Sequence, residues 1–466
     1  MILMLNSLFI STLLFAAHPL LTPAEAVAVC IEHQATLPEA QRQQTRYVMS
    51  TGADLEGRSR QWIAVNYLLN AVSRSRIIVA AQLIADGRIA VVDLAAYSNQ
   101  AVPGSYESLF AAWENLVKEQ PYWHVRTTVV DGEKKTGTAE VTVDGGWVGI
   151  EQALNLREST GSFGAIMRAD FFVARVGAEN YYEFAGVGAT EAEILKSLGV
   201  DEGAINAIIG GTAANLTRSG VTRKPRRVIG YQSLIGQVFV TLDTDRETAD
   251  ANPFHFPVDA NGQAFKRVAS EGFGLKNNGM WLTWVVDAQG KRADTVPDKI
   301  AKDYTGDGII RSGVSCIRCH ELNGGAAALQ PFEDKQAKLQ RLKGVAAVDP
   351  AVAQVLASAY DPARMGKLIA RSREDYHAAV EQATGVEPKE AATALAGVFS
   401  AYRDDPVTPE IAAYELSLTV ETLPEVFAQS RNPDLLLLTI GEPINRGPWE
   451  SAYQEAALLA EEWRKK

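Results

Sequence analysis

Two of the chain's three cysteines lie in one five-residue stretch, Cys316-Ile317-Arg318-Cys319-His320. In an exported protein a C-x-x-C-H pattern predicts covalent attachment of haem c. Two residues between the thiols place both sulfurs against the two vinyl groups of one porphyrin, and the adjacent imidazole then reaches the iron. A haem needs about 100 residues around it, the size of one ordinary domain. The motif therefore predicts one covalent haem c held by Cys316 and Cys319, with His320 as an iron ligand.

A C-x-x-C pair has two other common roles, a thioredoxin-like redox pair and half of a zinc site. Cys30 is the one remaining cysteine, so the chain has no second C-x-x-C. No βαβ pattern surrounds the motif either. Haem attachment is the interpretation that these observations favour.

Two candidates for the sixth iron ligand, Met365 and His377, lie downstream of the motif. A methionine ligand would raise the reduction potential and a second histidine would lower it, whereas an empty position would permit ligand binding or peroxide chemistry. Met365 follows Asp361-Pro362, a junction between loop and helix from which small cytochromes commonly offer their methionine. We predict Met365 as the axial partner of His320.

Residues 1–26 have the pattern of a secretory signal peptide, with an apolar run from Leu8 to Leu21 and the small-x-small sequence Ala24-Glu25-Ala26. The alternative is an uncleaved anchor helix. The run contains His18 and Pro19 and is shorter than the roughly 20 residues that a membrane span needs. We expect an exported, periplasmic protein.

Cys30 lies just beyond the predicted cleavage site. Lipid attachment to Cys30 is the minority interpretation, because Val29 is larger than the residue expected before a lipidated cysteine. We predict that Cys30 is a free thiol on a short N-terminal arm. No later segment approaches 18 consecutive apolar residues, so no membrane span is expected after signal cleavage.

The length and the net charge of the chain bear on the number of domains and on the kind of partner. A chain of 466 residues exceeds the size of a single hydrophobic core, so several domains are expected. The 45 basic and 56 acidic residues give a net charge of −11, which disfavours nucleic acid as a partner.

The distribution of apolar residues predicts an α+β fold with four regions after the signal peptide. We expect an α+β region at 27–155, a mixed region at 156–305 that is β-rich in its later half, a mostly helical, cytochrome c-like haem region at 306–405, and C-terminal helices at 406–466. Trp62, Val65, Leu69 and Val72 share one helical face.

Several shorter elements are also predicted. The features are a hairpin of strands 77–84 and 88–94 joined by Asp86-Gly87, a helix through Leu109, Trp113 and Leu116, strands at 127–130, 140–143, 238–242 and 281–286, a turn at Asn261-Gly262, a capping box at Thr190 and Glu193 with Gly199 at the helix end, a helix start at Thr408-Pro409, and a last helix at 448–463.

A basic cluster precedes the later strands. It consists of Arg218, Arg223, Lys224, Arg226 and Arg227. We expect a solvated face there. The alternatives are a docking patch for an acidic partner and counter-charge to a buried anionic group.

Nearly the whole chain after the signal peptide resembles a family of exported cytochrome c domain proteins of planctomycete-like bacteria. The stretches that carry the resemblance are 70–74 (NAVSR), 168–172 (RADFF), 219–223 (SGVTR), 225–227 (PRR), 278–281 (NGMW), 315–320 (SCIRCH), 364–368 (RMGKL) and 406–408 (PVT). The strand at 92–97 departs from the family pattern, because it lacks the basic and acidic pair expected before Tyr97. The resemblance implies Cys316, Cys319 and His320 as haem ligands and Met365 as an axial partner, but it implies no reaction.

These observations lead to an expected function with two alternatives. We expect an electron-transfer protein that exchanges electrons with a redox partner protein. The first alternative is a peroxidase- or dehydrogenase-like haem enzyme whose substrate is held by the N-terminal region. The second is a haem-based ligand or redox sensor. The iron's sixth ligand, its exposure and its partner decide among the three, and the motif spacing fixes none of them.

Overall fold

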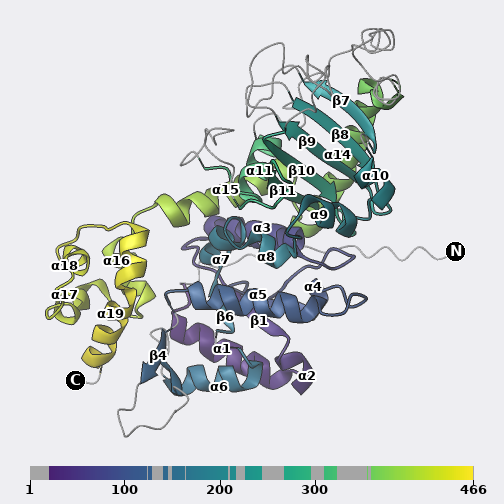
Figure 1. Ribbon diagram of the computed structural model, residues 1–466. Coiled ribbons are helices and arrows are strands. Elements are labelled where there is room, and N and C mark those ends of the chain that lie inside the picture. The colour runs from purple at the N-terminus through teal and green to yellow at the C-terminus, as the bar shows by residue number, and fades with distance from the viewer. Residues whose placement is uncertain are drawn as a thin grey trace, which may run out of the picture.

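Helix α3 (Leu55–Val72) lies between two sheets in the computed structural model (Figure 1). Asp54 caps it by accepting a hydrogen bond from Gly57 N at 2.6 Å. The predicted face of Trp62, Val65, Leu69 and Val72 is buried, and the helix packs against α7, α14 and α15. Helix α3 therefore packs both against α7, from the earlier part of the chain, and against α14 and α15, from its later part.

The structure describes residues 20–122, 124–128, 140–144, 150–162, 164–207, 210–216, 226–243, 267–294, 309–322, 354 and 358–464. The prediction of an α+β fold is confirmed. The strands are β1 (Thr45–Met49), β2 (Gln82–Ile84), β3 (Ile89–Asp93), β4 (His124–Thr128), β5 (Glu140–Asp144), β6 (Ile166–Arg168), β7 (Thr212–Leu216), β8 (Arg226–Gln232), β9 (Gln237–Asp243), β10 (Ala269–Leu275) and β11 (Trp281–Asp287).

The helices besides α3 lie mainly in the first and last thirds of the chain (Figure 1). They are α1 (Pro23–Thr36), α2 (Glu39–Arg42), α4 (Leu94–Tyr97), α5 (Ser105–Glu119), α6 (Ile150–Thr160), α7 (Ala169–Val176), α8 (Tyr181–Ala185), α9 (Glu191–Ser197), α10 (Glu202–Asn206), α11 (Val314–Ile317), η3 (Arg318–Leu322), α14 (Pro362–Thr384), α15 (Pro388–Asp404), α16 (Pro409–Glu415), η5 (Val420–Thr422), α17 (Leu423–Val426), α18 (Pro433–Thr439) and α19 (Arg446–Arg464).

The first sheet has the order β2-β3-β1-β6, with β6 parallel to β1. Strand β6 thus belongs to this sheet although it lies beyond residue 155, where the first predicted region ends. The Asp86-Gly87 turn connects β2 to β3 as predicted, but β2 begins only at Gln82. The preceding backbone is paired with a side chain instead, since the Asn70 amide exchanges two hydrogen bonds of 2.8 Å with Val79.

Cys30 does not lie on a short arm, and that prediction is wrong. It is fully buried within α1, where Ala26 and Val27 are buried as well. Thr22 and Glu25 form a capping box at the start of this helix, so the predicted cleavage sequence forms its first turn. Residues 1–19 of the predicted signal peptide lie outside the described residues.

The second sheet is antiparallel and has the order β11-β10-β9-β8-β7. Strands β9 and β11 were predicted, whereas β7, β8 and β10 were not. One face meets the end of α9, where a Cβ on Gly274 would lie 3.0 Å from Leu198 Cδ1. The other face carries α14, whose Met365 and Ile369 pack on β7, β8 and β9.

The helix starts predicted at Thr190 and Thr408 and the predicted last helix are confirmed. Thr190 and Glu193 form the capping box, and Gly199 adopts φ +78°. Thr408 caps α16, and α19 is the predicted last helix. The Asn261-Gly262 turn lies outside the described residues. Among the helices that the structure describes, none combines the length and apolar character that crossing a bilayer requires.

Candidate cofactor site

The C-x-x-C-H motif forms the short helix α11 and one π-helical turn, η3. Cys316, Cys319 and His320 are each partly exposed, whereas Ile317 and Arg318 between them are buried. Residues three and four apart share one helical side. The local structure therefore presents two thiols and an imidazole on the same partly open side.

Gly313 allows this helix to start against α7. It adopts φ +95°, and a Cβ there would lie 2.7 Å from Gly177 O. Val314 N donates to the same carbonyl at 2.9 Å, and Gly313 N donates to Thr283 Oγ1 on β11 at 3.2 Å. Two elements far apart in sequence thus fix the position of the motif.

Strands β10 and β11 form the surface opposite the motif. The His320 ring lies 5.2 Å from the Phe273 ring and 6.1 Å from the Trp281 ring, between centroids. Burial raises the pKa of the Cys316 thiol to about 12, even though a hydrogen bond to Thr283 opposes the rise. Burial lowers the pKa of His320. The neutral imidazole that iron ligation needs is therefore the favoured form.

An ion triad of the buried Arg226 and Asp243 and the partly exposed Glu271 lies on the same face of the sheet. Arg226 Nε is 2.7 Å from Asp243 Oδ1, and Arg226 Nη1 is 3.1 Å from Glu271 Oε2. Burial raises the pKa of Asp243 to about 6, although Arg226 acts in the opposite direction. Arg226 Nη2 and Asp243 Oδ2 have no hydrogen-bond partner among the described residues. When both acids are ionised, the triad has one more negative than positive charge.

The expectation of a solvated basic face is wrong for Arg226 and Arg227. Both are buried, and they point to opposite faces of the sheet because they are consecutive in β8. Arg226 is counter-charge to the chain's own carboxylates, the buried Asp243 and the partly exposed Glu271. Arg218, Arg223 and Lys224 lie outside the described residues.

Aromatic packing links the motif to α3. The Trp281 ring stacks on the Tyr376 ring with centroids 3.9 Å apart and an interplanar angle of 6°. The Tyr376 hydroxyl lies 2.8 Å from the Tyr67 hydroxyl in the buried interior. This stack gives His320 a rigid wall on one side.

Met365 is fully buried in a cluster with Val228 and Phe239, on the same face of the sheet as the motif. A Cβ on Gly230 would lie 3.2 Å from Met365 Sδ, so the glycine leaves room for the thioether. Phe273 packs against this cluster and against His320. The structure brings Met365 to the correct face but packs its sulfur on the sheet.

His377 contacts Glu321, the residue that follows the C-x-x-C-H motif in the chain. His377 Nε2 is 3.3 Å from Glu321 Oε2, and Arg373 Nε donates to His377 Nε2 at 3.2 Å. Burial raises the pKa of Glu321, with His377 and Arg373 opposing the rise. These groups line a groove of about 380 Å³ that also reaches Glu387.

The residues present fit a covalent haem in two respects. The thiols and the imidazole share one partly open side, which is the donor set that a c-type haem uses. The unpartnered Nη2 of Arg226 is a buried donor suited to a carboxylate. Among the described residues, no group of three or more His, Cys, Asp or Glu side chains is arranged to hold a metal ion by itself.

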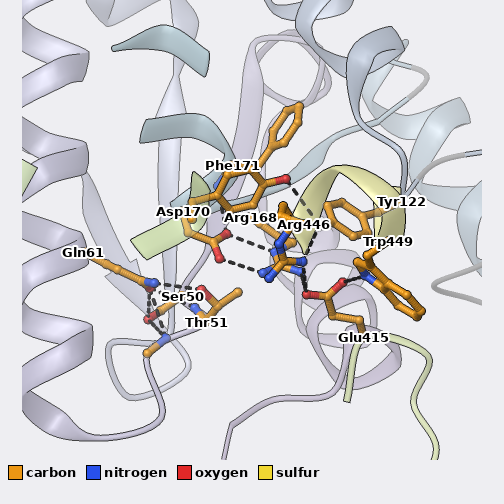
Figure 2. Close-up of polar contacts among 12 residues, drawn as sticks. Ser50, Thr51, Gln61, Tyr122, Arg168, Asp170, Phe171, Glu415, Arg446 and Trp449 are labelled. Carbon is orange, nitrogen blue, oxygen red and sulfur yellow. Dashed lines mark hydrogen bonds and ion pairs between the residues drawn. The ribbon is translucent and has the colours of Figure 1, made fainter. Parts of the chain in front are cut away.

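A second charged centre joins side chains from β6, α7, α16 and α19, and Figure 2 shows Arg168, Asp170, Glu415 and Arg446 close together. Arg168 forms a two-bonded pair with Asp170, at 3.0 and 2.6 Å, and an ion pair with Glu415. Glu415 also accepts from Arg446 Nη1 at 2.7 Å and from Trp449 Nε1 at 2.6 Å. Two arginines and two carboxylates balance each other in this network.

A cavity of about 460 Å³ adjoins the second centre and reaches Thr51, Tyr402 and Tyr414. Its wall at Thr51 is held by Gln61, whose Oε1 accepts from Ser50 Oγ at 2.8 Å and from Thr51 N at 2.9 Å (Figure 2). Arg168 and Asp170 lie in the stretch 168–172 that carries the resemblance, but no spacing in the sequence connects them with Glu415 and Arg446, which come from distant segments.

Comparison with known proteins identifies no relative: no family model, no curated protein and no solved structure matches the chain.

Proposed function

We propose that the chain is an exported c-type cytochrome that binds one haem c covalently and transfers electrons to or from a redox partner protein. The observation that carries the proposal is the C-x-x-C-H motif with its two thiols and imidazole on one side of a short helix. In this proposal Cys316 and Cys319 hold the porphyrin through thioether bonds, and His320 is the proximal ligand. The bound iron supplies one-electron chemistry between its ferrous and ferric states.

The chain's own residues would then set the surroundings of that iron. Trp281, stacked on Tyr376, fixes one side of the His320 ring. The low-polarity packing that lowers the pKa of His320 keeps the imidazole neutral. Arg226 offers its free Nη2 to an anionic group of the cofactor.

The decisive experiment measures covalent haem after expression in a host with c-type haem maturation. We expect one haem per chain in the wild type, retained in a denaturing gel. Cys316→Ser with Cys319→Ser should lose it completely. Cys30→Ala is the matched control, because it removes the third thiol from a buried site outside the motif and should keep the haem. A wild-type chain without covalent haem contradicts the proposal.

One observation favours a second candidate, the haem enzyme with substrate in the N-terminal region. The cavity of about 460 Å³ is lined partly by residues 51–61 and has the size of a small-molecule site. Peroxide- or donor-dependent turnover that falls when Ala401→Trp fills the cavity would support the enzyme. Unchanged electron exchange in that variant, with no turnover in either protein, supports the cytochrome.

A further inference from the structure

The ion triad lies beside the proposed haem ligand because of the strand register. Phe273 pairs with Phe239 and Thr283 across the sheet, so these three side chains share a face. Glu271 is two residues before Phe273 in β10 and therefore points to the same side. Since the Phe273 ring contacts the His320 ring, the Glu271 carboxylate lies next to the motif.

The electrostatics agree with this placement. The negative charge of Glu271 acts to raise the pKa of both His320 and Cys316, against the effect of burial on the imidazole. Arg226 and Arg373 oppose Glu271 at His320. Asp243 pairs with Arg226, and Arg226 Nε lies 2.7 Å from Asp243 Oδ1.

The charge of the triad is not balanced within itself. One guanidinium faces two carboxylates, and Glu271 is the partly exposed one, with 24% of its side chain accessible. A negative charge near an iron centre favours the ferric over the ferrous state, because the ferric state carries one more positive charge. Surroundings that exclude water make this effect larger than it would be at the protein surface.

We propose that Glu271 is a positioning residue for the redox centre, one that lowers the reduction potential of the iron through its charge beside His320. This inference rests on the proposed function. The couple exchanges one electron, no bond forms or breaks, and the electron comes from an electrode or chemical reductant in the test and from the redox partner in use.

The test is a potentiometric titration of the full-length, haem-loaded protein. At the potential where the wild type is half reduced, Glu271→Gln should raise the ferrous-to-ferric ratio about three- to tenfold, tenfold corresponding to about 59 mV for one electron. Asp243→Asn should change the ratio less, in the same direction. Glu271→Asp keeps the charge and should stay near the wild type.

Glu191→Gln is the matched control, since Glu191 pairs with Arg267 on the other face of the same sheet. It should leave the ratio unchanged. Absorption spectra of all variants should match the wild type, which separates a charge effect from a lost ligand. If Glu271→Gln shifts the ratio no more than Glu191→Gln while covalent haem is intact, this inference is overturned and the cytochrome proposal stands. If Glu271→Gln fails to fold, an unshifted ratio in Asp243→Asn overturns it. Absence of covalent haem in the wild type overturns both.

Discussion

Two ionic centres among the residues that the structure describes are built differently. The network around Glu415 joins helices α7, α16 and α19 with two arginines and two carboxylates, and Glu415 is 1% exposed. The triad around Arg226 lies within one sheet, has two carboxylates for one arginine, and keeps Glu271 partly exposed. The first arrangement is typical of a structural connection, because every charge is compensated where it is buried. The second leaves a net negative charge beside the C-x-x-C-H motif.

The difference appears in the direction of the pKa shifts. Burial alone would raise the pKa of the Glu415 carboxyl, but Arg168 and Arg446 together hold it below its usual range. At Asp243 burial prevails over Arg226, and the pKa rises to about 6. Compensated charge thus stabilises the ionised form in one centre, and incomplete compensation disfavours it in the other.

The largest effect is expected for Glu415→Gln. It leaves Arg168 and Arg446 buried with less compensation, so the free energy of unfolding should fall by about 3–5 kcal/mol. Urea denaturation followed by circular dichroism measures it. Glu425→Gln is the control, because Glu425 also accepts a hydrogen bond from a tryptophan, Trp463, but at the surface. If Glu425→Gln changes the free energy of unfolding by more than about 0.5 kcal/mol, or Glu415→Gln changes it only slightly, the network around Glu415 is not the structural connection described.

The pH dependence of stability should have opposite signs at the two centres. Because the folded pKa of Glu415 is lowered, its contribution is present above its unfolded pKa and is lost as the pH falls through the folded value. The folded pKa of Asp243 is raised to about 6, so its contribution is present below about pH 4 and is lost as the pH rises through 6.

Urea midpoints at pH 4.5 and pH 7 check these signs. The advantage of the wild type over Glu415→Gln should shrink at pH 4.5. Its advantage over Asp243→Asn should grow there, by up to about 2 kcal/mol. A parallel change in both variants would show that the two centres do not differ in this way.

The sequence predicted those features that depend on neighbouring residues. The caps at Thr190 and Thr408 and the buried face of α3 are local patterns, and the structure contains each of them. Strand β10 was missed because two glycines interrupt its apolar pattern. Gly272 is there because a Cβ would lie 2.2 Å from the Trp284 ring, a contact that only strand pairing creates.

Most residues of the two ionic centres could not be predicted for the same reason. For Arg226 the role of counter-charge to a buried anionic group was an alternative, and the structure pairs it with Asp243 and Glu271. Arg226 and Arg227 read as surface charge until β8 is placed in the sheet. Glu271 reaches the motif through the register of β10 with β11, and Glu415 reaches Arg168 through the packing of distant helices. None of these contacts has a local signature in the chain.

A substitution at Met365 should have a smaller effect on stability, and it tests how this side chain packs on the second sheet. Met365→Leu keeps the volume and the apolar character of the site, so the free energy of unfolding should change by less than about 1.5 kcal/mol. Because the sulfur packs on Gly230, we expect the haem absorption of the loaded protein to stay unchanged. Loss of a long-wavelength charge-transfer band in the ferric spectrum would instead assign Met365 as the axial ligand predicted from sequence.

The smallest effect on stability is expected for Glu271→Gln. Arg226 keeps its 2.7 Å pair with Asp243, and the replaced carboxylate is partly solvated, so little compensation is lost. Removing one of two carboxylates also relieves their mutual repulsion, which contributes to the raised pKa of Asp243. The free energy of unfolding should therefore change by no more than about 1 kcal/mol, several times less than for Glu415→Gln. Equal losses at both sites in urea denaturation would mean that the triad is a structural connection like the network around Glu415, and that its unequal charge has no separate role.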